Sequence, residues 1–172
     1  MSIPAALQRR RDYDGPAIFS YGFRPFFLAA GLWAIIGILL WIPQYMGKMS
    51  VPTHLSPLDW HVHEMLYGYV AATVAGFLLT AIPNWTGRLP VNGWPLAGLA
   101  ALWLAGRLAL LTSAQLGGVV AAVIDTAFLA TVALVAGREI VAGKNWRNLR
   151  VLVILVGLVL AKIIFQPQVL TS

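Results

Sequence analysis

Long runs of apolar residues, separated by short polar stretches, make up most of this chain. Five runs approach the roughly 20 mostly apolar residues that a helix needs to cross a bilayer. They cover residues 25–45, 56–83, 95–112, 117–138 and 148–165. The fifth run is the weakest, because Lys162 interrupts it and Pro167 follows soon after. The pattern predicts an all-α, polytopic transmembrane helix bundle with about five spanning helices.

Local signals sharpen two of these boundaries. Ser56, Pro57 and Asp59 are typical of a helix start, with serine as the cap and proline at the first helical position. The second helix would therefore begin before the histidines at positions 61 and 63. The pair Gly117-Gly118 predicts the turn between the third and fourth helices.

Composition supports a membrane protein. Hydrophobic residues make up 59% of the 172 positions and charged residues 10%, with a mean hydropathy of +0.78. Soluble domains carry roughly a quarter charged residues, so we expect the lipid bilayer as the main partner. The chain has no cysteine, which excludes disulfides, iron–sulfur clusters and thiolate zinc sites. Imidazole, carboxylate and thioether groups are the metal ligands that it can offer.

The net charge of +6 is explained by topology rather than by nucleic acid, because the basic residues flank the apolar runs. Nine arginines and lysines fall on the side predicted to be cytoplasmic, and they are Arg9, Arg10, Arg11, Arg24, Arg88, Arg138, Lys144, Arg147 and Arg150. The other three are Lys48, Lys162 and Arg107, which lies within a span. We therefore expect residues 1–24 to be a cytoplasmic segment, 25–166 a transmembrane domain and 167–172 a short tail, in a bacterial inner membrane.

Aromatic residues are expected at the membrane boundary. The seven tryptophans are predicted mostly to mark helix ends, as in an interfacial belt; they are Trp33, Trp41, Trp60, Trp85, Trp94, Trp103 and Trp146. The segment 20–27 is interpreted as an aromatic and basic start of the first span. Its Phe26 and Phe27 are expected to face lipid.

The residues most able to carry chemistry are His61, His63 and Glu64, at the outer part of the second span. The two histidines are about 200° apart on an ideal helix, so they cannot bind one metal together. His61 is expected to share a face with Glu64, and His63 with Tyr67. Each histidine could ligate a metal with help from another helix, and Glu64 could orient His61 or carry a proton. The alternative is that the cluster lies in wet headgroups without a function.

Two further charges lie inside apolar spans. Arg107 is in the third helix and Asp125 in the fourth, and the position halfway between them is beside the turn at Gly117. In an antiparallel hairpin the two side chains would therefore lie at the same depth. Because charges within a membrane usually pair or line a polar path, we favour a structural ion pair and keep a proton path as the alternative.

Four segments together resemble the NnrS family: residues 19–27 (FSYGFRPFF), 60–65 (WHVHEM), 75–88 (AGFLLTAIPNWTGR) and 102–107 (LWLAGR). The resemblance implies an inner-membrane protein that contains haem and copper and is linked to nitric oxide, denitrification and resistance to nitrosative stress. It specifies no catalysed reaction. Carried onto this chain, it implies His61 and His63 as cofactor ligands, with Glu64 beside them at the metal.

The resemblance also implies a longer protein with further helices and histidines. The chain would then be the N-terminal part, and the missing helices or another subunit would be partners. Residues 162–172 are expected to depart from the family. A different class, a bundle that translocates protons or a solute with His61 and Glu64 and no metal, is the alternative function. A third possibility is a structural membrane subunit with no site of its own.

Overall fold

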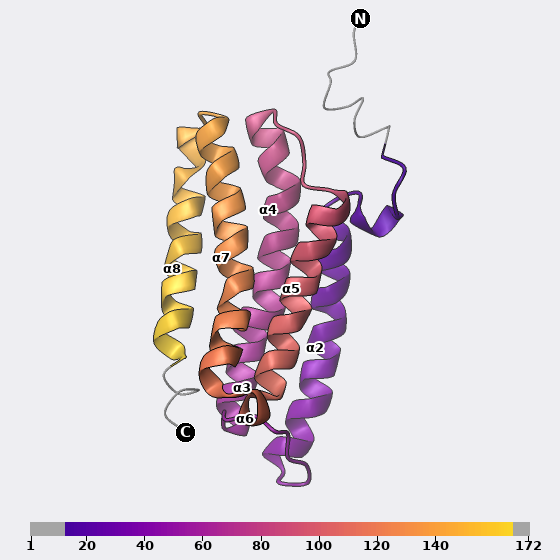
Figure 1. Ribbon diagram of the computed structural model, residues 1–172, viewed down its shortest axis with the longest axis vertical. Coiled ribbons are helices and arrows are strands. Elements are labelled where there is room, and N and C mark those ends of the chain that lie inside the picture. Colours follow the sequence, from indigo (N-terminus) through magenta and orange to yellow (C-terminus); the bar gives the residue numbers. More distant parts are fainter. Residues whose placement is uncertain (1–12, 167–172) are drawn as a thin grey trace, which may run out of the picture.

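The computed structural model describes residues 13–166, and these contain five helices long and apolar enough to cross a membrane (Figure 1). The spans are α2 (Phe23–Tyr45), a continuous helix from Pro57 to Thr86, α5 (Gly93–Leu111), α7 (Gly118–Ala142) and α8 (Leu149–Phe165). No strand occurs in this part of the chain. The all-α prediction and the five predicted spans are confirmed, whereas the predicted tail at 167–172 lies outside the described residues.

Short elements precede or connect the spans. They are η1 (Ala17–Phe19), α6 (Ser113–Leu116) and η3 (Trp146–Asn148). The predicted cap at the second span is present, because the Ser56 side chain accepts the Asp59 backbone N–H at 3.2 Å. The predicted turn before α7 is also present, and Gly117 adopts a φ of 93°, a conformation that suits glycine.

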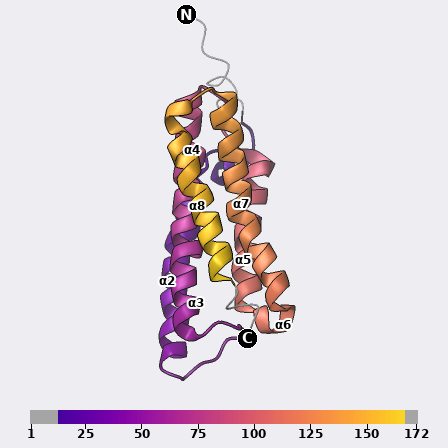
Figure 2. The same cartoon turned by 90° about the vertical axis from the view of Figure 1, so that its left-hand side faces the viewer.

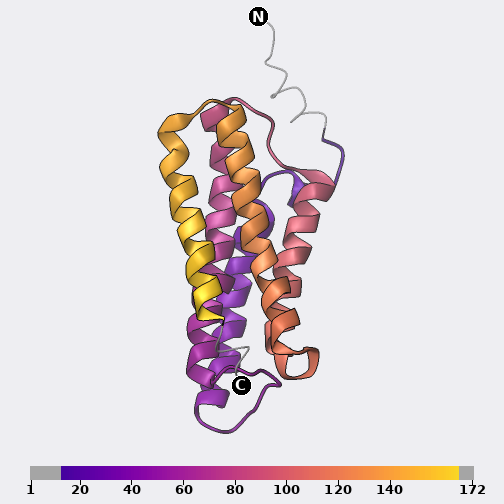
Figure 3. The ribbon, with the colours of Figure 1, turned by 60° about the vertical axis from the view of Figure 1, so that its left-hand side comes forward.

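The helices form one upright bundle with α2 and α8 on opposite sides in Figure 1. α5 packs mainly on α7, and α2 packs mainly on the second span. Turning the bundle brings α8 to the front (Figure 2), where it lies along α7. Figure 3 shows that the described chain begins at one end of the bundle and that α8 ends toward the other. Only 11% of the α8 span is buried, so its apolar surface suits lipid.

The second span contains a π-helix, η2 (Glu64–Val70), between α3 (Pro57–His63) and α4 (Ala71–Thr86). Pairs of buried residues recur along it every four positions, at 63/64, 67/68, 71/72 and 75/76. In an α-helix with 3.6 residues per turn, a spacing of four drifts by about 40° each turn. The wider turn of the π-helix absorbs this drift, so these residues keep facing the bundle interior.

The prediction that most tryptophans mark helix ends is confirmed. Five of the seven lie within five residues of an end of their span, and they are Trp41, Trp60, Trp85, Trp94 and Trp146. Trp33 and Trp103 instead lie near the middle of α2 and α5, where both are buried. The indole N–H groups of Trp33 and Trp103 have acceptors inside the bundle, which removes the need for interfacial water.

The expectation for the two phenylalanines held only for Phe27, which is 46% exposed. Phe26 is fully buried and its ring lies 5.5 Å from that of Phe128 in α7. Neighbouring positions on a helix differ by about 100°. A run of aromatic residues therefore does not indicate which of them faces the core.

Candidate functional site

Five ionisable side chains meet in the interior of the bundle, near the end that carries α6. Each is at most 1% exposed. They come from α3, η2, α5, α7 and α8, and they are His63, Glu64, Arg107, Asp125 and Lys162. We call these residues the ion network. Its two carboxylates and two cations cancel in formal charge when the histidine is neutral.

Asp125 is the centre of the network. Its Oδ1 accepts hydrogen bonds from Arg107 Nη2 and, at 2.8 Å, from Lys162 Nζ. Its Oδ2 lies 3.0 Å from His63 Nε2, an ion-pair distance that does not reach hydrogen-bond geometry. Gln166 Nε2 donates to Oδ2 at 3.4 Å and to a backbone carbonyl of α7 at 3.0 Å. The structure thus brings Arg107 and Asp125 together, in a larger cluster than the predicted pair.

Glu64 joins the second span to α2 and α5. Its Oε2 accepts the Trp33 indole N–H at 2.7 Å and Arg107 Nη1 at 3.2 Å. Its Oε1 lies 3.1 Å from His63 Nδ1. Both carboxylate oxygens are therefore engaged by side chains of this chain, and Arg107 bridges the two carboxylates of the network.

The two histidines have separate surroundings, as the helix geometry predicts. The His63 ring packs on Tyr67, with centroids 5.0 Å apart, and on Phe165 of α8. His61 instead stacks on Trp41 of α2, with centroids 3.9 Å apart and planes inclined by 14°. Its buried Nδ1 has no hydrogen-bond partner among the described residues.

The predicted partnership of Glu64 with His61 was wrong, because the Glu64 carboxylate contacts His63. Residues 61 and 64 keep α-helical geometry, but the Glu64 carboxylate turns toward the donors of Trp33 and Arg107, whereas the His61 ring stacks on Trp41. The interfacial alternative is also wrong for His63 and Glu64, since both are fully buried. His54 lies in the loop before Ser56, where its backbone N–H donates to Ser113 Oγ at 3.0 Å.

Glycines allow the helices to approach closely at the network. A Cβ built on Gly68 would lie 2.7 Å from Trp33 Nε1 and 2.8 Å from both Arg107 Nη1 and Glu64 Oε2. At Gly106 of α5, a Cβ would lie 3.1 Å from the Cα of Asp125. The Gly68 carbonyl also accepts the Trp103 indole N–H at 3.0 Å. The polar groups can converge because neither helix presents a side chain at these points.

Sequence reasoning missed three members of the site. Lys162 interrupts the fifth apolar run, and a lysine in such a run is itself a signal of a buried partner. Trp33 carries no signal that separates a buried residue from one in an interfacial belt. No sequence signal marked Gln166, whose contacts with α7 depend on where α8 packs.

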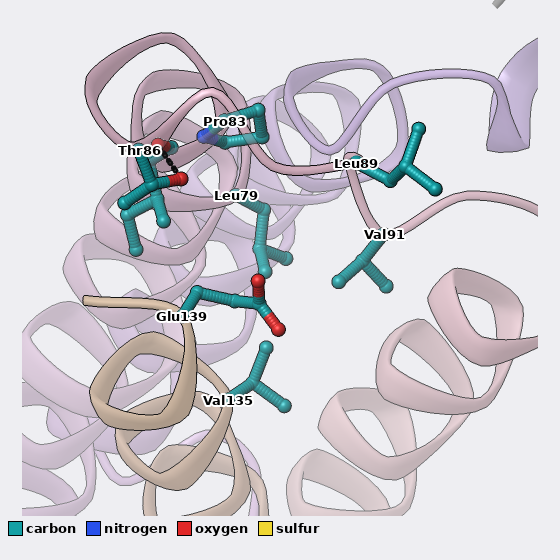
Figure 4. Close-up of a pocket in the computed structure, with 8 residues that line it drawn as sticks. Leu79, Pro83, Thr86, Leu89, Val91, Val135 and Glu139 are labelled. Atoms are coloured by element: carbon teal, nitrogen blue, oxygen red, sulfur yellow. Dashed lines mark hydrogen bonds between the residues drawn. The ribbon is translucent and has the colours of Figure 1, made fainter. Parts of the chain in front are cut away.

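The opposite end of the bundle holds a smaller polar contact. Arg88, just after α4, pairs with Glu139 of α7, and Asn145 Nδ2 donates to the Trp85 carbonyl at 2.7 Å. The Glu139 carboxylate points into a hollow beneath Pro83 (Figure 4). This hollow offers about 10 Å³, room for at most one water. The hollow is therefore too small to bind a small molecule, and the polar contacts around it serve to join the helix ends.

The fold and the ion network define a class: a polytopic helical membrane protein with a charge-balanced polar centre inside the bundle. The chain belongs to the NnrS family, because the family model described as NnrS protein matches residues 17–172. The match continues through residues 162–172, so the expected departure of this segment from the family was wrong. No curated protein and no solved structure matches the chain. Membership suggests a membrane protein related to nitric oxide.

Proposed function

We propose that this protein acts in nitric oxide metabolism and in resistance to nitrosative stress, with haem and copper as cofactors. The observation that carries the proposal is the family match over residues 17–172. His61 and His63 are the candidate ligands. Bound haem iron or copper would supply a coordination site for a diatomic molecule such as nitric oxide.

The residues fit this proposal unequally. His61 has a buried ring nitrogen without a hydrogen-bond partner, which suits one bond to a metal. Both nitrogens of His63 face carboxylates of the network, so a metal there would compete with Asp125. The described residues contain no group of three histidine, cysteine or acidic side chains that could hold a metal. The histidines would therefore serve separate centres, each completed by ligands from elsewhere.

We expect His61→Ala to lower the haem or copper content of purified protein at least about tenfold, because losing even a partner of a metal ligand costs 10–100-fold in metal affinity. His63→Ala is expected to lower the content of a second centre and to destabilise the network. The measurements are the visible spectrum and metal analysis of protein made in a haem-replete host. His54→Ala is the matched control and should keep both cofactors. Equal content in all three variants would reject the ligand assignment.

The second candidate function is translocation of protons or a solute without a metal. The buried charges favour it, because ionisable groups within a membrane often line transport paths. The network does not continue toward the opposite end, where Phe26, Leu79 and Phe128 form an apolar core. A colourless, metal-free preparation that catalyses proton-coupled uptake would favour this function over the first.

We also propose that the N-terminus is cytoplasmic and that the ion network lies in the outer half of a bacterial inner membrane. The asymmetry of arginine and lysine supports this orientation. Single cysteines in this cysteine-free chain test it. An impermeant thiol reagent added to intact spheroplasts should label Met49→Cys and leave Asp14→Cys unlabelled until the membrane is opened. Labelling in the reverse pattern would invert the topology.

A further inference from the structure

The segment that leads into α2 has no part in the proposed cofactor site, yet it forms a groove of its own. The groove is shallow, measures about 480 Å³, and is lined by Ala17, Ile18, Phe23, Arg24 and Phe27. Four of its five side chains are apolar. Arg24 is its single charged member.

The Arg24 side chain is held in place at the groove. Its Nη1 donates to the Ala17 carbonyl at 2.9 Å, and its guanidinium carbon lies 5.5 Å from the Tyr21 ring and 6.0 Å from the Phe23 ring. A guanidinium has five N–H donors. Within residues 13–166, Arg24 makes no ion pair with an acidic side chain. Donors therefore remain for an external anion.

The groove lies where a phospholipid would meet the protein. Arg24 is in the first turn of α2, in the half of the bundle where α7 joins α8 (Figure 1), and the preceding Phe23 donates its backbone N–H to Thr80 Oγ1, about two turns before α4 ends. Phe23 and Phe27 are 37% and 46% exposed on the outer surface, which places them against acyl chains. The same half carries Arg138, Lys144, Arg147 and Arg150, so its charge complements an anionic headgroup.

We propose that this groove binds an anionic phospholipid. The Arg24 guanidinium holds the phosphate, for which its planar fork of donors is well suited. Phe23, Phe27 and Ile18 contact the acyl chain. A free phosphate is the poorer occupant, because the groove supplies a single cation and otherwise apolar walls.

Competition between phosphatidylglycerol and phosphatidylcholine in detergent micelles tests the proposal, with native mass spectrometry counting the lipids that the full chain retains. The unaltered protein should retain phosphatidylglycerol preferentially. Arg24→Gln should weaken its binding about tenfold, the loss expected for a charge-assisted hydrogen bond. Arg24→Lys should keep an intermediate affinity, because it keeps the charge and loses the fork.

Arg138→Gln is the matched control, because Arg138 lies in the same half of the bundle with its side chain 78% exposed and outside the groove. Equal losses in Arg24→Gln and Arg138→Gln would overturn the proposal in favour of general surface charge. Displacement of the lipid by inorganic phosphate alone would overturn it in favour of a free-anion site. If Arg24→Gln does not fold, equal retention of the two lipids by the unaltered protein would also overturn it.

Discussion

Asp125→Asn is expected to destabilise the folded protein by about 3–5 kcal/mol, the cost of leaving a buried charge without its partner. Asp125 is the one acidic group that contacts Lys162 among the described residues, and it also holds Arg107. Its loss therefore leaves the Lys162 ammonium unpaired inside the bundle. Unfolding of purified protein in mixed micelles, followed by circular dichroism, measures the change.

The network also predicts which second substitution compensates. In Asp125→Asn/Lys162→Met both members of one pair are removed, and Arg107 still pairs with Glu64. This double variant should be more stable than Asp125→Asn alone. Arg107→Met/Asp125→Asn should recover less stability relative to Asp125→Asn, because Lys162 stays unpaired. If both double variants are as unstable as the worse single one, the pairings do not determine stability.

Gly68→Ala is expected to cost about 1–3 kcal/mol, the range for overpacking a tightly packed interior. The added methyl group would overlap polar atoms of Trp33, Glu64 and Arg107, none of which can move without breaking a hydrogen bond. The same unfolding measurement applies, and it should show a lower midpoint.

Gly31→Ala is the control for this glycine, because a Cβ there would meet nothing within 4 Å. It should be neutral or stabilising by up to about 1 kcal/mol, since alanine favours a helix over glycine. If the two glycine variants lost equal stability, the close approach at Gly68 would not be a structural requirement.

The fold could be predicted because length and apolarity suffice to identify membrane spans. The contact between Arg107 and Asp125 could be predicted too, since a short turn at Gly117 places residues equally distant from it at equal depth. The first inference needs only the composition of each span. The second needs only two consecutive helices joined by a short turn.

Contacts between helices distant in sequence could not be predicted in this way. Nothing near Lys162 indicates that α8 lies along α7 with this side chain turned toward Asp125. Likewise, Trp33 is as compatible with a lipid boundary as with a hydrogen bond to Glu64 until the packing of α2 is known. The composition of each span indicates that it crosses the membrane, but not which side faces its neighbours.

The partner of Glu64 could not be predicted from helical spacing either, because the donors that hold its carboxylate come from Trp33 of α2 and Arg107 of α5. The π-helix that follows has one signal in the sequence, a four-residue recurrence of small or polar pairs from His63-Glu64 to Ala75-Gly76. This recurrence is hard to see in a hydrophobicity profile, because alanine, glycine and histidine do not produce strong peaks in such a profile.

Because of the π-helix, the direction in which the His63 side chain points depends on the number of residues between Glu64 and Val70 rather than on which residues they are. With one residue fewer between Glu64 and Val70, the span could continue as an ordinary α-helix, still apolar and still long enough to cross the membrane. Its outer segment would be rotated by about 100° relative to α4. His63 would then turn away from Asp125, although every residue that contacts it would still be present.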